Sequence, residues 1–194
     1  MYSLSEEEKR RLKDGIQAAY AIPFIHDITD FIWEAVFSYT KKIPVVDPMV
    51  NTRKKLLYDV VDEKTKTGWS AKAIQVSLQL PASYDLVIQR ADIFKKGTRL
   101  GYGELNKNSS PEILGEALLL HWYSKVENDA VVQKVSSGRV CILLKTRNRR
   151  RYGYFEEELA RYSASELSWH WTDGTKTGLQ GVRKKDGEVV FRWY

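Results

Sequence analysis

Apolar residues recur at helical spacing in three stretches of the chain. The first begins at Ser5, which precedes three glutamates that suit the positive end of a helix dipole, and it predicts a helix over 5–20. A second helix is predicted over 24–41, where isoleucines and other apolar residues recur every three or four positions. A third is predicted over 110–128, because a serine, a proline and a glutamate in succession form a strong helix start.

Patterns typical of strands occupy most of the middle of the chain. They predict strands over 56–62, 69–80 and 84–94, separated by short polar turns. The alternation in the third of these is imperfect. A continuous apolar run over 139–144 predicts a further strand, which is buried.

The tail after residue 167 contains two Asp-Gly pairs, which are typical of tight turns, and it predicts a hairpin or a small sheet. Together with the order helix, three strands, helix and strand that precedes it, the tail indicates a mixed α/β (α+β) fold. At 194 residues the chain suits one domain. We expect an N-terminal helix in 1–23, a core in 24–152, and a C-terminal extension in 153–194 that packs on the same domain.

Composition narrows the class of protein. Apolar residues make up 43% of the chain and aromatic residues 12%, which is enough for a core and too much for a disordered protein. No apolar run approaches the ~20 residues that span a bilayer, and the N-terminus lacks an apolar signal segment, so we expect no membrane partner and a cytoplasmic location. The lone Cys141 lies in an apolar run, where we expect a small buried side chain, and it excludes an internal disulfide or a multi-cysteine zinc site. The chain has neither a phosphate-binding glycine loop nor a nucleophile-elbow motif, which argues against nucleotide hydrolysis, dehydrogenase and serine-hydrolase chemistry.

Positive charge favours an anionic partner, and nucleic acid first. The formal net charge is +6, and five of the seven residues in 145–151 are cations. An arginine-rich run that directly follows a predicted core strand suits contact with phosphate. The candidate phosphate contacts are Lys145, Arg147, Arg149, Arg150 and Arg151.

Candidate chemistry is concentrated in residues 58–75. Two strand patterns flank a polar turn there, with Asp59 and Asp62 at the end of the first and Ser70-Ala71-Lys72 at the start of the second. A hairpin would bring the acids and the lysine together. An acid that holds a metal ion and a lysine that faces a phosphate form a plausible pair for cutting nucleic acid.

The element order and this hairpin resemble the nuclease core of the PD-(D/E)XK superfamily, which includes most type II restriction endonucleases. In that family an αβββαβ core places an acid at the end of one strand and an acid-X-Lys triplet on the next. Here Asp59 or Asp62 would be the acid and Ser70-Ala71-Lys72 the triplet, within a resemblance that covers about residues 24–147. Ser70 stands where the family usually has a carboxylate, and a hydroxyl is a poor ligand for Mg²⁺.

The resemblance implies a Mg²⁺ site built from Asp62 or Asp59, the backbone carbonyl of Ala71 and a carboxylate displaced from the triplet. Lys72 would orient or help deprotonate the attacking water and stabilise the scissile phosphate. The candidates for the displaced carboxylate are Asp85, Asp92 and Glu34, with Gln75 as a fallback polar ligand.

The resemblance therefore implies a hydrolase of a prokaryotic restriction-modification system: a Mg²⁺-dependent, sequence-specific endonuclease that cuts double-stranded DNA. Most such enzymes act as homodimers on palindromic sites. Contacts to base edges would come from outside the hairpin, and the candidates are Arg99, Asn106, Gln180 and Arg183. Two other functions stay open. One is a catalytically inactive DNA-binding domain, which the missing triplet acid favours, and the other is an interaction domain that binds no nucleic acid.

Overall fold

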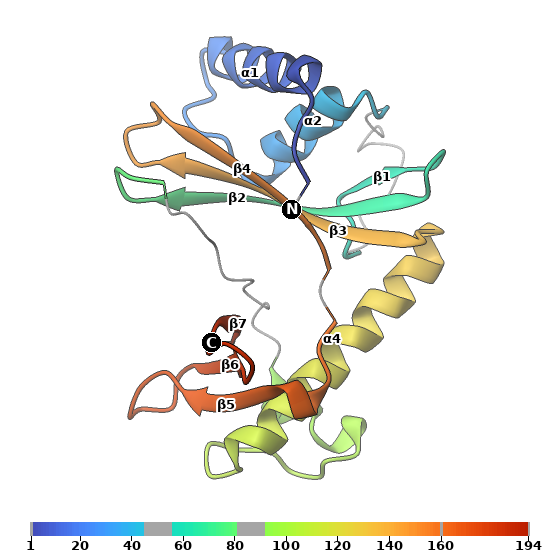
Figure 1. Ribbon diagram of the computed structural model, residues 1–194, viewed down its shortest axis with the longest axis vertical. Coiled ribbons are helices and arrows are strands. Elements are labelled where there is room, and N and C mark those ends of the chain that lie inside the picture. The colour runs from blue at the N-terminus through green and yellow to red at the C-terminus, as the bar shows by residue number, and fades with distance from the viewer. Residues whose placement is uncertain (1, 45–55, 81–91, 160, 194) are drawn as a thin grey trace. The chain divides into compact units, whose positions relative to one another are not determined.

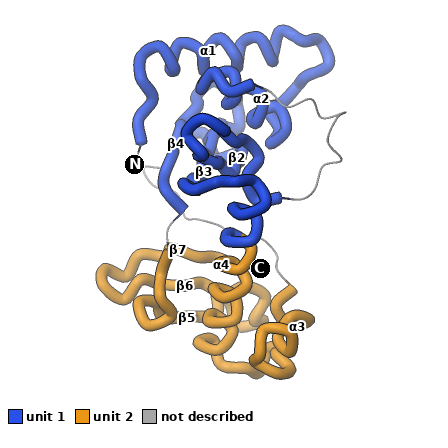
Figure 2. The backbone as a smooth tube through the Cα atoms, turned by 90° about the vertical axis from the view of Figure 1, so that its right-hand side faces the viewer, with its two compact units in different colours: residues 1–81, 126–160 blue, residues 82–125, 161–194 orange. Residues whose placement is uncertain are grey.

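A computed structural model describes residues 2–44, 56–80, 92–159 and 161–193. The chain forms two compact units, each built from two segments of the sequence (Figure 2). The first unit comprises residues 1–81 and 126–160, and the second comprises residues 82–125 and 161–194. Helices and sheets occur together, so the predicted mixed α and β class is confirmed. The restriction-endonuclease-like core and the segment boundaries expected at residues 23 and 152 stay predictions.

Two helices of the first unit follow different kinds of start signal. Helix α1 (Glu6–Ala21) begins where predicted, because Ser5 and Glu8 form a reciprocal capping box. Helix α2 (Asp30–Lys41) begins six residues later than predicted. The reason is a distant contact, since the Lys145 ammonium binds the carbonyl oxygen of Ile28 at 2.6 Å and holds the preceding segment as a loop.

The first unit contains a four-stranded sheet in the spatial order β1-β2-β3-β4 (Figure 1). The central strands β2 and β3 run parallel, and each outer strand is antiparallel to its neighbour. Chain between the two parallel strands includes helix α4 (Pro111–Gln133). The strands are β1 (Val60–Asp62), β2 (Thr67–Val76), β3 (Ser137–Thr146) and β4 (Tyr152–Glu158).

Besides α2, several elements differ from the sequence-based predictions. Strand β1 begins four residues after the predicted start at 56, and β2 ends four residues before the predicted end at 80. The predicted strand over 84–94 lies mostly outside the described residues, and its end is the short helix α3 (Ile93–Lys96), capped by Asp92. Helix α4 continues five residues beyond the predicted end, where the Asp129 carboxylate accepts a hydrogen bond from the backbone N–H of Leu57. Strand β4 is absent from the predicted elements, because three successive acids, residues 156–158, interrupt its aromatic pattern.

Helix α2 covers one face of the sheet and forms the core of the first unit. Trp33 and Phe37 are fully buried against Trp69 and Ala71 of β2 and against Cys141 of β3. Burial raises the pKa of the Cys141 thiol well above its usual value, and the predicted role of Cys141 as a small buried side chain is confirmed.

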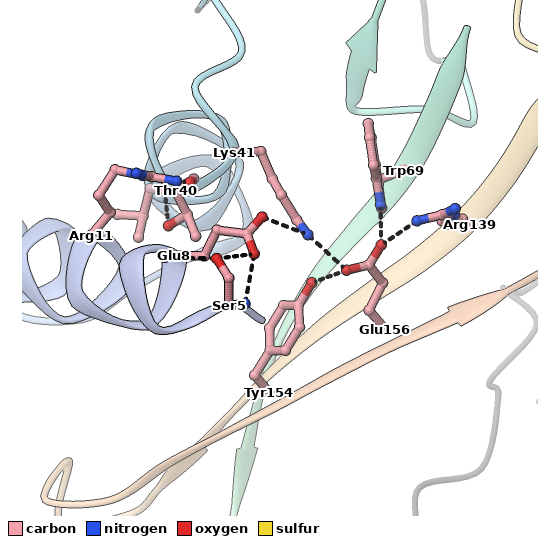
Figure 3. A network of polar contacts seen from close by, with 10 residues as sticks. Ser5, Glu8, Arg11, Thr40, Lys41, Trp69, Arg139, Tyr154 and Glu156 are labelled. Atoms are coloured by element: carbon pink, nitrogen blue, oxygen red, sulfur yellow. Dashed lines mark hydrogen bonds and ion pairs between the residues drawn. The ribbon is translucent and has the colours of Figure 1, made fainter. Parts of the chain in front are cut away.

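A fully buried carboxylate, Glu156 of β4, connects this core to both helices (Figure 3). It accepts hydrogen bonds from Trp69 Nε1 at 2.9 Å, Arg139 Nη1 at 2.9 Å and the Tyr154 hydroxyl at 2.5 Å. The Lys41 ammonium lies 3.1 Å from Glu156 and 3.2 Å from the carboxylate of the capping residue Glu8. Burial alone would raise the pKa of Glu156, but these donors and the Lys41 charge hold it below its usual value.

The second unit contains a three-stranded antiparallel sheet, β5 (Leu167–Trp171), β6 (Leu179–Arg183) and β7 (Val189–Trp193). The two Asp-Gly pairs lie between these strands, so the small sheet predicted for the tail is confirmed. Trp169 packs so closely on α4 that a Cβ atom at Gly115 would lie 2.2 Å from its ring. The short 3₁₀ turns η1 (Thr98–Leu100) and η2 (Ala164–Glu166) complete this unit.

Candidate active site

Asp59 directly precedes strand β1 and lies beside the part of the β2 edge that β1 does not cover. The backbone N–H of Asp59 donates to the Trp69 carbonyl at 2.8 Å, and Trp69 is also the residue that pairs with Val60, the first residue of β1. Its side chain continues along the same edge of β2, and Oδ2 accepts a hydrogen bond from the Ala71 N–H at 2.8 Å. The Asp59 carboxylate therefore accepts a hydrogen bond that, in a longer β1, a backbone carbonyl would accept.

A second carboxylate occupies the following position on the same edge. Asp30, the first residue of α2, accepts a hydrogen bond from the Ala73 N–H through Oδ1 at 2.7 Å. Residues two apart on a strand direct their backbone groups to the same side, about 7 Å apart. The Ala71 carbonyl lies between these two N–H groups, so three oxygen atoms are brought to one short stretch of β2.

Lys72 supplies the positive charge of this site. Its ammonium lies 3.1 Å from the Ala71 carbonyl oxygen and 3.4 Å from Asp59 Oδ2. The two side chains are only partly exposed, 35% for Lys72 and 21% for Asp59. The predicted meeting of Asp59 with the Ser70-Ala71-Lys72 triplet is therefore present in the structure.

The negative charge of Asp59 is unfavourable in this site, chiefly because the carboxylate is buried. Burial raises the pKa of the Asp59 carboxyl, and the negative charge of Asp30 raises it further. The charge of Lys72 and the Ala71 N–H act in the opposite direction, but the pKa stays above its usual value. An additional cation at this edge would relieve the repulsion between the carboxylates.

The donor atoms match the preferences of Mg²⁺. Among the described residues, no three Cys, His, Asp or Glu side chains form a metal-binding group. Mg²⁺ does not need such a cage, because it commonly binds one or two carboxylates and completes its octahedron with water and substrate phosphate. Asp59, Asp30 and the Ala71 carbonyl offer a set of hard oxygen ligands of that kind.

The other predicted acids lie elsewhere or outside the described residues. Asp62 accepts hydrogen bonds from the Lys64 N–H and the Thr65 hydroxyl, so it holds the hairpin turn. Glu34 lies one helical turn after Asp30 on α2. The remaining candidates are Asp85, which is outside the described residues, Asp92, which caps α3 in the second unit, Gln75, which is exposed on β2, and Ser70, which is buried.

Sequence reasoning did not select Asp30. The predicted helix over 24–41 placed Asp30 inside the helix, where its carboxylate would have no special role. In the structure α2 begins at Asp30, so its side chain reaches past the helix end to the edge of β2. The available signal was its position off the apolar stripe of that helix, shared with Glu34.

The predicted basic run divides into one buried lysine and four exposed arginines. Lys145 is 5% exposed, and its ammonium binds Asp27 Oδ2 at 2.5 Å, which leaves little of it for a phosphate. The exposed members lie in the turn between β3 and β4, and they are Arg147, Arg149, Arg150 and Arg151.

The four candidates for base contact all belong to the second unit. Asn106 accepts a hydrogen bond from the Asn108 N–H and so organises its own loop. Arg183 is bound by the carboxylates of Asp186 and Glu188. Arg99 is exposed after α3, and Gln180 lies half-buried on β6.

Comparisons with protein-family models, with curated proteins and with solved structures found no match to this chain. Within the described ranges, no helix has the length and apolar character needed to cross a membrane.

Proposed function

We propose that the protein is a Mg²⁺-dependent endonuclease that hydrolyses phosphodiester bonds of double-stranded DNA. The observation that carries this proposal is the cluster of the Asp59 carboxylate, the Ala71 carbonyl and the Lys72 ammonium on β2, with Asp30 at the next position of the same edge. Acid, carbonyl and lysine in this order are what the resemblance to PD-(D/E)XK nucleases implies.

Each residue of the cluster has a chemical task in this proposal. Asp59, Asp30 and the Ala71 carbonyl would hold the metal ion, and Asp30 would supply the carboxylate that Ser70 does not. A bound Mg²⁺ lowers the pKa of a water molecule and offsets negative charge on the phosphate. Lys72 would donate a hydrogen bond to a phosphate oxygen and hold the attacking water in line with it. Hydrolysis would leave a 5′-phosphate and a 3′-hydroxyl.

Cleavage of long DNA of mixed sequence tests this assignment. We expect cleavage with Mg²⁺ and none with EDTA. Lys72→Ala, Asp59→Asn and Asp30→Asn should each lower the rate by about 10²-fold or more, the usual scale for one group that stabilises charge in a transition state. Asp62→Asn is the matched control, because Asp62 belongs to the same hairpin but binds only its turn. Undiminished cleavage by the Lys72→Ala protein would contradict the proposed mechanism.

A DNA-binding domain without catalysis is the second candidate. It is favoured by two observations: Ser70 replaces the triplet acid, and four arginines are exposed on one turn. Binding of a labelled duplex would then weaken steeply with salt while no cleavage occurs under any divalent cation. Restriction-type specificity, a homodimer and a prokaryotic cytoplasmic location stay predictions attached to the first candidate.

A further inference from the structure

The segment between α1 and α2 presents an apolar tip, Ile22 and Phe24. Phe24 is 79% exposed and Ile22 is 39% exposed. A phenylalanine with most of its surface in water loses the free energy that burial of its ring would provide. It is therefore a candidate for contact with a partner.

This segment is held in place by ion pairs with the far end of β3. Asp27 Oδ2 binds the Lys145 ammonium at 2.5 Å, and the same ammonium binds the Ile28 carbonyl. Asp27 Oδ1 also lies 3.9 Å from Arg149 Nε, so the loop after Phe24 is joined directly to the turn that follows β3. In Figure 1 the connection from α1 to α2 and the turn from β3 to β4 lie on the same side of the first unit.

That turn, residues 147–151, has a backbone fixed by hydrogen bonds and carries four arginines, and it is called the arginine turn below. The Asn148 carboxamide oxygen accepts hydrogen bonds from the Thr146 hydroxyl and the Arg150 N–H. The Arg151 N–H donates to the Thr146 hydroxyl, and Arg149 has a left-handed backbone with φ of 58°. The backbone is fixed by these bonds, while all four arginine residues are exposed.

Charge decides between the possible partners of the apolar tip. A second copy of the chain could cover an exposed phenylalanine, but Asp27, three residues after Phe24, lies 3.9 Å from Arg149, so the copy would approach the positive charge of the arginine turn. Asp27, the acid that links the two segments, is already paired with Lys145 and lies close to Arg149. An apolar side chain beside arginines is the combination that DNA-bending proteins use when they insert a wedge between base steps.

We propose that Phe24 is such a wedge, which enters the base stack of duplex DNA while the arginine turn holds the adjacent phosphates. This inference rests on the proposed function, since it takes its partner to be DNA. The position is compatible with the candidate active site. Val76 of β2 pairs with Thr146, next to the arginine turn, and lies four residues or about 13 Å beyond Lys72. One duplex can span that distance, because a helical turn of DNA is about 34 Å long.

Linking-number measurement tests the wedge without knowledge of a recognition sequence. Lys72→Ala protein in EDTA is mixed with closed circular plasmid, which is then relaxed by a metal-independent topoisomerase and separated from protein. Insertion of a side chain between base pairs changes DNA twist, so the topoisomer distribution should shift in proportion to bound protein. Addition of Phe24→Ala should remove most of this shift, and Phe24→Leu should retain part of it.

Two controls separate the wedge from general binding. Val131→Ala removes an apolar side chain of similar exposure, 80%, from α4 and should leave the shift unchanged. Anisotropy of a fluorescein-labelled duplex should show that Phe24→Ala keeps the salt dependence of binding, because the phosphate contacts remain. Because Phe24 is so exposed, its replacement should not impair folding.

The outcomes distinguish this inference from the function on which it rests. If the Lys72→Ala protein binds no DNA at low salt, both the endonuclease proposal and the wedge are wrong. If DNA binds with a steep salt dependence but the protein with the added Phe24→Ala change gives the same topoisomer distribution as the parent Lys72→Ala protein, only the wedge is wrong. A Phe24→Ala protein that loses self-association in sedimentation but keeps the linking-number shift would assign the apolar tip to a second copy instead.

Discussion

Replacement of Glu156 by glutamine should strongly destabilise the first unit, although the two side chains have nearly the same shape. The carboxylate is fully buried and is surrounded by four donors, on Trp69, Arg139, Tyr154 and Lys41. A carboxamide has one acceptor oxygen, and its NH₂ group must face donors that it cannot satisfy. The positive charges of Arg139 and Lys41 would also lose a buried counter-charge.

The expected loss follows from these contacts. Removal of one member of a buried ion pair typically costs about 3–5 kcal/mol, because the remaining charge stays buried. The Lys41 ammonium keeps its contact with Glu8, so we expect about 3 kcal/mol of unfolding free energy to be lost. For a chain of this size that corresponds to a fall of about 10 °C in Tm. Equilibrium urea unfolding, followed by tryptophan fluorescence and circular dichroism, measures it.

Glu157→Gln is the matched control, because Glu157 is the exposed neighbour on the same strand and should change the free energy by less than about 0.5 kcal/mol. The pH dependence gives a second test. The pKa of Glu156 is lowered in the folded protein, so its stabilisation is present above the unfolded value of about 4.3 and is lost as pH falls through the folded value. The difference between wild type and Glu156→Gln should therefore shrink below about pH 4.3. Equal stabilities of the two variants at pH 7 would refute this account of the network.

Three further outcomes are expected. Asp59→Asn should abolish cleavage but leave the free energy of unfolding at pH 7 unchanged or raise it, because the pKa of Asp59 is raised and its charge is therefore unfavourable in the folded protein. Urea titrations at pH 7 and pH 3 should show that any gain vanishes below the pKa of Asp59 in the unfolded chain, about 3.9. Gly115→Ala should destabilise the second unit by about 1–3 kcal/mol or more, since its Cβ would meet the Trp169 ring, and near-ultraviolet circular dichroism should report the disturbed indole. Asp27→Ala leaves the Lys145 ammonium buried without a counter-charge and should lower Tm by several degrees, whereas an unchanged Tm would show that this pair does not hold the loop.

Elements with local signals were predictable from the sequence. The start of α1 depends on a capping box four residues long, and the start of α4 on Ser110 and the proline that follows it. The hairpin of β1 and β2 was predicted from its two strand patterns and polar turn, and it brought Asp59 to the triplet at Ser70-Ala71-Lys72. In these cases residues close in sequence determine the structure.

Elements that depend on distant contacts were not predictable. The start of α2 is set by Lys145, which lies 117 residues after Ile28 in the chain, and without that start Asp30 is an ordinary helix residue. Strand β4 ends in three successive acids, so its sequence favours an exposed loop. Glu156 is nevertheless buried within the strand, where its carboxylate pairs with Arg139 and Lys41, and no local pattern reveals these partners.

The way in which the edge of β2 is closed has a consequence for the behaviour of the protein in solution. A strand edge with unpaired backbone groups invites another chain to pair with it, and proteins avoid such aggregation by placing charges there. Asp59 and Asp30 occupy the N–H groups of Ala71 and Ala73 and repel any incoming strand. The carboxylates proposed for chemistry thus also keep molecules apart, and a doubly neutral variant should precipitate at concentrations that the parent protein tolerates.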